Sequence, residues 1–157
     1  MEATDLDLAT LASLTGSGAA RLLLERLAEA GHPGVRVSHG YVFQRLVSDE
    51  PTIGALAASL GITQQGASKQ VGELEQLGYV ERVATDGDQR SRRVRLTTDG
   101  RAVVEAGRAD RARLEAEVVA RVGEDTVRAA KQALAALLDL AGLDDRVRTR
   151  SVPLPPG

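Results

Sequence analysis

The strongest constraint on the fold is a change in the spacing of apolar residues between Thr52 and Thr97. Up to Gly78 the apolar residues recur every three or four positions, which predicts two short helices separated by a turn at Gly61. Beyond Gly78 the spacing falls to two, which predicts a pair of strands joined by a polar tip at Thr85–Ser91. A helix, a tight turn, a second helix and a hairpin in this order predict a winged helix-turn-helix.

The first of these two helices is predicted to be short and tightly packed. Its inward face carries Ile53, Leu56, Ala57 and Leu60. The small side chain of Ala57 permits a close helix–helix approach, Gly61 permits a sharp turn, and Ile62 can fill the corner. Thr52 and Thr63 stand where N-caps are expected. This arrangement would hold the second helix away from the body, so that it could enter a major groove.

The second helix is predicted to expose a polar face suited to reading base edges. The candidate DNA contacts on it are Thr63, Gln64, Gln65, Ser68 and Lys69. A glutamine can pair with adenine through two hydrogen bonds, and serine and lysine can reach bases or phosphates. An ordinary solvated helix face is the alternative interpretation of the two glutamines. Glu73 and Glu75 come later and are expected to lie away from the groove, because phosphates would repel them.

The hairpin concentrates the positive charge of a chain whose net charge is only −2. Its segment Arg82–Arg95 holds five arginines against two aspartates. An arginine on a narrow loop suits the minor groove, where the potential is most negative. The candidate wing residues are Asp88, Arg90, Arg92 and Arg93, with Asp88 expected to hold the tip in shape. A solvated strand face is the alternative for the arginines beyond the tip, and the favoured interpretation for Arg95.

The stretch from Thr52 to Arg101 resembles the winged-helix core of the MarR family of transcription regulators. The family's wing shows Asp, one residue, Arg, five residues and then Leu-Thr, and Asp88, Arg90, Leu96 and Thr97 have that spacing. The run LEQLGYVER also fits the family pattern.

The resemblance implies a homodimer on a palindromic operator, with double-stranded DNA as partner and a small-molecule effector that releases a repressor. The expected fold is mainly α with a small β-hairpin wing (α+β), the winged core being flanked by long dimerisation helices. The implied division is an N-terminal dimerisation helix (5–34), a DNA-binding lobe (35–97), C-terminal dimerisation helices (98–142) and a flexible tail (143–157). His39 and Tyr41 would border the effector pocket, although a capped helix start with a hydrogen-bonded histidine is the favoured interpretation.

The sequence departs from the family pattern at three positions. Asp86 stands where family members often have proline, two residues before the wing aspartate. Gly66 and Gly72 lie inside the second helix, and each costs about 1 kcal/mol of helix propensity relative to alanine. The absence of cysteine excludes sensing by a thiol.

Local signals also predict the flanking elements. We expect a first helix at Asp5–Leu14, an interruption by the poor helix formers of Thr15–Gly18, and a resumed helix at Ala19–Ala30. The remaining predictions are a helix at Ser38–Val47 capped by Ser38, long helices at Thr98–Val122 and Glu124–Ala141, and a frayed tail from Asp144.

Several classes of function are not expected. Two histidines and no cysteine argue against a metal site, and no nucleophile–base set or glycine-rich phosphate loop suggests an enzyme or a cofactor. No apolar run is long enough for a membrane helix, and the first 14 residues lack the basic start of a signal peptide, so a cytoplasmic protein is expected. The alternative function is a winged helix that binds proteins, which would favour an uncharged wing.

Overall fold

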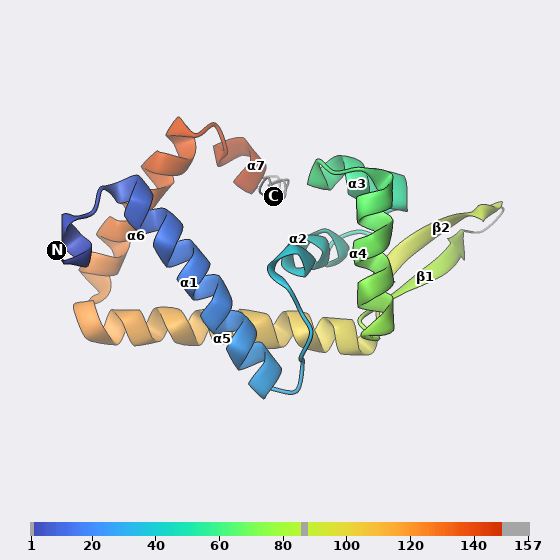
Figure 1. The fold of residues 1–157 in the computed structure, drawn as a ribbon, viewed down its shortest axis with the longest axis horizontal. Helices are drawn as coiled ribbons and strands as arrows, with labels where there is room; N and C mark the ends of the chain where they lie inside the picture. Colours follow the sequence, from blue (N-terminus) through green and yellow to red (C-terminus); the bar gives the residue numbers. More distant parts are fainter. Residues whose placement is uncertain (1, 86–87, 149–157) are drawn as a thin grey trace.

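The computed structural model describes residues 2–85 and 88–148, with the side chains of 85–91 and 148 left out. The fold is mainly helical with one antiparallel hairpin (Figure 1). The elements are η1 (Ala3–Asp5), α1 (Leu8–Glu29), α2 (Val37–Leu46), α3 (Ile53–Leu60), α4 (Gln64–Gln76), β1 (Val80–Thr85), β2 (Asp88–Leu96), α5 (Thr98–Val122), α6 (Glu124–Leu140) and α7 (Asp144–Arg148).

The 25-residue helix α5 forms the long axis of the molecule. One end of α5 adjoins the lobe built from α2, α3, α4 and the hairpin, while α1 crosses its middle and α6 returns from its far end (Figure 1). The N-cap hydroxyl of Thr97 accepts a hydrogen bond from Gly100 N–H at 3.0 Å, which fixes where α5 starts. Arg26 of α1 pairs with Glu117 of α5 at 2.8 Å and ties the two helices together.

The turn between α3 and α4 has the predicted construction. Thr52 and Thr63 are both N-caps, and each side-chain oxygen accepts a backbone N–H three residues on. Gly61 ends α3 at φ 67°, in the left-handed region that favours glycine. Ile62 N–H then donates to the carbonyl of Ala57 at 3.1 Å, and Ala57 itself is buried between the helices.

The hairpin is joined to the start of α3 as well as being paired within itself. Val80 lies opposite Leu96 in the register, with Glu81 opposite Arg95. Val94 N–H donates to the carbonyl of Pro51 at 2.9 Å, and Thr52 and Arg93 form an isolated antiparallel bridge. The residues before α3 thus act as a short third strand at the edge of β2.

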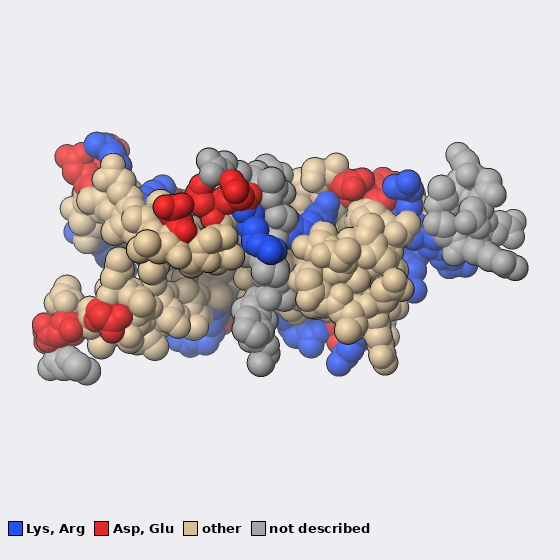
Figure 2. All heavy atoms as spheres, turned by 90° about the horizontal axis from the view of Figure 1, so that it is seen from above, with Lys and Arg blue, Asp and Glu red and all other residues tan. Residues whose placement is uncertain are grey.

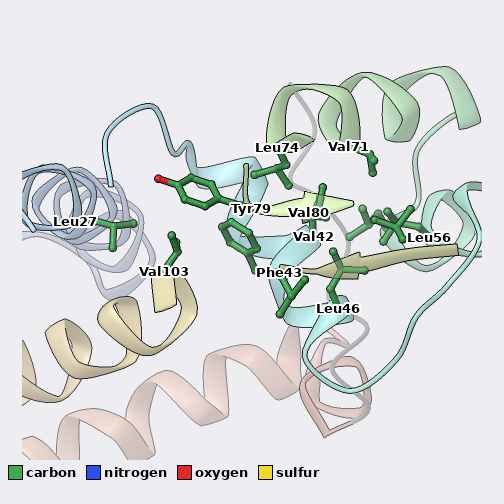
Figure 3. Packing of buried hydrophobic residues seen from close by; sticks show 13 residues of the cluster. Leu27, Val42, Phe43, Leu46, Leu56, Val71, Leu74, Tyr79, Val80 and Val103 are labelled. Carbon is green, nitrogen blue, oxygen red and sulfur yellow. The ribbon is translucent and has the colours of Figure 1, made fainter. Parts of the chain in front are cut away.

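The core lies inside the lobe and reaches the start of α5. Phe43 and Tyr79 meet edge to face at a centroid distance of 6.3 Å, and Leu27 and Val103 bring α1 and α5 onto the same cluster (Figure 3). The remaining fully enclosed members come from α2, α3, α4 and β2, and include Val42, Leu56, Leu60, Val71, Leu74 and Val94. The inward faces predicted from the sequence for α2, α3 and α4 therefore form one core.

Two predictions about the first two helices were wrong. α1 runs without a break through Thr15–Gly18, because good helix formers flank the four residues and the helix packs on α5 beyond them. α2 begins at Val37 with Arg36 as its N-cap, and not at a Ser38 cap. The ring of His39, the third residue of the helix, accepts the backbone N–H of Arg36 at 3.2 Å, which is the role of the glutamate or glutamine in a capping box.

Two boundaries further along the chain also differ from prediction. The return strand β2 begins at Asp88, inside the segment predicted as a polar tip, and its register shifts between Ala84 and Thr85. The C-terminal segment forms α7 at Asp144–Arg148, where a frayed tail was predicted. Acidic residues at the start of a helix favour its positive end, which accounts for a helical turn beginning at Asp144 and Asp145.

Candidate nucleic-acid interface

The start of α4 presents the predicted polar face to solvent. Thr63, Gln64, Gln65 and Lys69 are exposed, and Ser68 is half-buried. The opposite face of α4 holds Ala67, Val71 and Leu74, each of which is fully buried. Because that face is locked into the core, the rotation of α4 about its axis is fixed. Gly66 and Gly72 lie within the helix without interrupting it.

Gln64 lies beside the first turn of α3. A Cβ added at Gly54 would stand 3.3 Å from Nε2 of Gln64, so the glycine leaves room for the amide. Gln65 and Lys69, four residues apart, share one exposed side of α4. The two glutamines thus face different neighbours, although both remain accessible.

The acidic residues of α4 are engaged elsewhere. The carboxylate of Glu73 pairs with the guanidinium of Arg36 and lies 3.2 Å from Nε2 of His39. Glu75 lies 3.2 Å from Nε of Arg82 on β1. Both carboxylates therefore have cationic or N–H partners, in keeping with the expectation that they do not face phosphates.

The arginines of β2 differ in how they are held. Arg95 pairs with Glu81 across the hairpin at 2.8 Å, and Arg93 donates to the carbonyl of Glu50 at 2.9 Å. Arg92 is exposed and forms no ion pair with any residue that the structure describes. The side chains of Asp88 and Arg90 lie outside the described residues, so their predicted roles stay predictions.

Positive side chains gather around the base of the hairpin. Figure 2 shows a group of lysines and arginines at the end of the molecule next to the wing, with acidic side chains on the neighbouring part of the lobe. Among the described side chains of α4 and β2, the exposed cations in this region are Lys69, Arg92, Arg93 and Arg95. A local patch of this kind can attract a polyanion despite the net charge of −2.

His39 and Tyr41, the two candidate pocket residues, have different environments. The ring of His39 is 1% exposed, and burial followed by the charge of Arg36 lowers its pKa to about 4. It is a hydrogen-bonded core histidine and is absent from the lining of the neighbouring cavity. Tyr41 does line that cavity, which lies between α1, α2 and α5 and has a volume of about 620 Å³.

Sequence reasoning missed the basic residues of the cavity. Arg36, Arg108 and Arg111 line it together with aliphatic side chains. Arg108 and Arg111 follow Val104 by one and two helical turns, and this spacing could have placed them on one face of α5. Nothing local in the sequence pairs Arg36 with that face.

The described residues contain no group of three or more histidine, aspartate or glutamate side chains placed to hold a metal ion. No helix in the described part of the chain is long and apolar enough to cross a membrane.

A helix, tight turn, helix and arginine-bearing hairpin, built on one core, define a winged helix-turn-helix protein. The model of the MarR family matches residues 34–91, from the turn before α2 into β2. The lobe is thus a winged helix of the MarR family, and the whole chain has the MarR-type fold.

Solved structures agree over most of the chain. The reduced form of MarR from E. coli is 24% identical, with a TM-score of 0.69 over 85% of this chain and 97% of that chain. FabT from Streptococcus pneumoniae, solved in complex with DNA, is 17% identical, with a TM-score of 0.66 over 87% and 98% of the two chains. The S. aureus MepR–DNA complex is 20% identical, with a TM-score of 0.64 over 87% and 99%. At such identities the likeness concerns the fold, and no curated protein matches the sequence.

Proposed function

We propose that the protein is a sequence-specific DNA-binding transcription regulator. The observation that carries this proposal is that one rigid lobe exposes both a polar helix start and an arginine-bearing strand. Gln65 and Lys69 project from α4, and Arg92 projects from β2. The backbone bond between Val94 and Pro51 joins β2 to the segment before α3, and α3 packs on α4. α4 would enter the major groove while the wing follows the adjacent backbone into the minor groove.

Two similar structures support the nature of the partner. FabT was solved in complex with DNA, and MepR was solved as a DNA complex. The charged wing and α4 surface of this chain fit a polyanion better than an apolar protein partner, which disfavours the alternative of a protein-binding winged helix.

We propose further that the protein works as a homodimer on a palindromic operator. α6 is strongly amphipathic and exposes Leu134 and Leu138, one turn apart, which leaves an apolar face for a second copy. The start of α1 and the start of α6 lie near the end of α5 remote from the wing (Figure 1). Two copies joined there would present two α4 helices to successive major grooves.

The proposed output is repression that a small molecule relieves. The cavity between α1, α2 and α5 separates the proposed dimer helices from the DNA-binding lobe. A ligand seated there can favour a state in which the spacing of the two α4 helices no longer matches the operator.

The test is binding of the purified protein to a fluorescent duplex from upstream of its own gene. Unlabelled duplex of the same sequence should compete far better than scrambled duplex, and Arg92→Ala should weaken binding about tenfold. Arg128→Ala is the matched control, because that exposed arginine lies on α6 far from the wing. Equal competition by scrambled duplex, together with no effect of Arg92→Ala, would contradict the proposal.

A further inference from the structure

Gly72 is a glycine inside α4 that packing among the described residues does not explain. Apart from proline, glycine is the least favourable residue for the interior of a helix. A Cβ built on Gly72 would meet no described atom within 4 Å, so the lobe itself has room for a larger residue there. At Gly66, by contrast, an added Cβ would stand 3.3 Å from Oγ1 of Thr63, the N-cap of the same helix. Contacts within α4 therefore favour glycine at position 66, whereas none of the described contacts does so at position 72.

Gly72 lies on the face of α4 that we propose to meet DNA. Gln65, Lys69 and Gly72 are spaced by four and three residues, so they form one stripe along the helix, and Gln76 continues that stripe by a further turn. The side chains of Gln65, Lys69 and Gln76 are exposed. The missing side chain at Gly72 therefore leaves a low point in an exposed polar stripe, where the backbone of α4 can be approached from outside.

The two acidic residues nearest to Gly72 in the chain are held on either side of this stripe. Glu73 pairs with Arg36 at the start of α2, and Glu75 lies 3.2 Å from Nε of Arg82 on β1. The two carboxylates thus have cationic partners on different neighbouring elements. A strand of duplex DNA can follow α4 beyond its first two turns without meeting an unpaired carboxylate of that helix.

We propose that Gly72 is the point at which duplex DNA comes closest to the backbone of α4, so that its missing side chain determines how deeply the helix enters the major groove. Glycine suits a position where the backbone closely approaches a ligand. Gly72 is thus a positioning residue, because the depth that it permits brings Gln65 and Lys69 within reach of base edges. This inference deepens the proposed function and rests on it, since the ligand is the same DNA.

The test is a series of side-chain sizes at position 72, measured by fluorescence anisotropy with the labelled duplex from upstream of the gene. Gly72→Ala should weaken binding about threefold and Gly72→Leu about thirtyfold, because a larger side chain holds α4 further from the groove. Affinity for a scrambled duplex at low salt should change less than about twofold, because phosphate contacts without base reading tolerate shallower docking. Urea unfolding should show both variants to be at least as stable as wild type, which excludes a folding defect as the cause.

The size series also separates close approach from a requirement for a flexible helix. Alanine and leucine have similar helix propensities, so a loss caused by stiffening of α4 would be equal in the two variants. Gly18→Ala is the matched control, because Gly18 is an exposed glycine inside α1 whose added Cβ also meets no described atom within 4 Å. This variant should gain stability and keep the wild-type affinity for the upstream duplex.

The outcomes distinguish this inference from the proposed function. Equal losses in Gly72→Ala and Gly72→Leu, an unchanged affinity in Gly72→Leu, or a loss in Gly18→Ala as large as that in Gly72→Ala would overturn the inference. A parallel loss of affinity for the scrambled duplex would overturn it as well. In each of these cases a wild-type preference for the upstream duplex would leave the proposed function standing. Absence of that preference in the wild type would overturn the proposed function, and this inference with it.

Discussion

The hydroxyl of Thr97 donates a 2.6 Å hydrogen bond to the carbonyl oxygen of Gly78, which ties the start of α5 to the end of α4. The same oxygen accepts the N–H of Gly100 as the N-cap of α5. One side chain therefore joins the helix that we propose to read DNA to the long helix that leads to the proposed dimer interface.

Thr97→Val should lower the free energy of unfolding by about 1.5 kcal/mol, because it removes the cap and leaves the Gly78 carbonyl without this donor. Urea denaturation at a fixed protein concentration measures the change. Thr98→Val is the matched control, being equally β-branched, exposed and one residue into the helix. Equal losses in the two variants would show that the hydroxyl contributes nothing.

Gly100→Ala should destabilise the protein by at least about 3 kcal/mol, because the new Cβ would stand 1.9 Å from the carbonyl oxygen of Tyr79. That oxygen belongs to backbone and also accepts the N–H of Thr97, so it has little freedom to move. Gly72→Ala in α4 meets nothing within 4 Å and should stabilise the protein by up to about 1 kcal/mol. Thermal unfolding should rank the two variants on opposite sides of wild type.

Lys69→Ala and Arg92→Ala should each reduce the dependence of DNA affinity on salt. Each removes one proposed phosphate contact per protomer, so the slope of log K against log salt should fall by about 2 for a dimer. Arg95→Ala should have a smaller effect, because its side chain is already paired with Glu81. Fluorescence anisotropy at several salt concentrations gives the slopes, and identical slopes for all four proteins would count against this interface.

His39 should make the protein less stable in mild acid. Its pKa is lowered to about 4 in the folded state, against 6.5 in an unfolded chain, so only the unfolded chain gains a proton as the pH falls below 6.5. The stabilising contribution is complete above pH 6.5 and is lost progressively down to about pH 4. Between pH 7 and pH 5 the loss should be about 2 kcal/mol.

Urea unfolding of wild type and His39→Gln at the two pH values isolates this effect. Glutamine can still accept from Arg36 N–H and donate towards Glu73, yet it does not titrate. The pH-dependent loss should therefore shrink in the variant, and an undiminished loss would assign it to other groups.

Leu134→Glu combined with Leu138→Glu should convert the proposed dimer into monomers. The two side chains are 42% and 38% exposed in the single chain and lie one turn apart on α6. A charge buried at an interface without a partner is strongly unfavourable. Light scattering after size-exclusion chromatography measures the mass, with Gln132→Glu as the control, and an unchanged dimer would place the interface elsewhere.

The sequence predicted best where the signals were local. The caps at Thr52 and Thr63 were correct, because a hydroxyl that bonds to a nearby N–H acts within one turn. The change in apolar spacing around Gly78 likewise identified the order of helices and strands. The polar face of α4 followed from the same periodicity, since an inward stripe defines the outward one.

The sequence predicted least where distant segments meet. Propensity argued for a break at Thr15–Gly18, yet packing of α1 on α5 keeps the helix continuous. The partnership of Arg36 with Glu73 joins residues far apart in the chain and depends on how α2 sits on α4. No local sequence pattern predicts such a pair, so the basic residues that line the cavity could be identified only from the structure.

The bond from Val94 to Pro51 has a consequence for how this lobe could evolve. A hairpin hinged only at its own two ends could swing to suit operators of different groove width. In this protein a backbone hydrogen bond joins the hairpin to the segment before α3. The base of the hairpin therefore cannot tilt without disturbing the helix-turn-helix. A lobe of this kind would adapt to new operators by substitution of its exposed side chains and by insertions or deletions at the outer end of the wing.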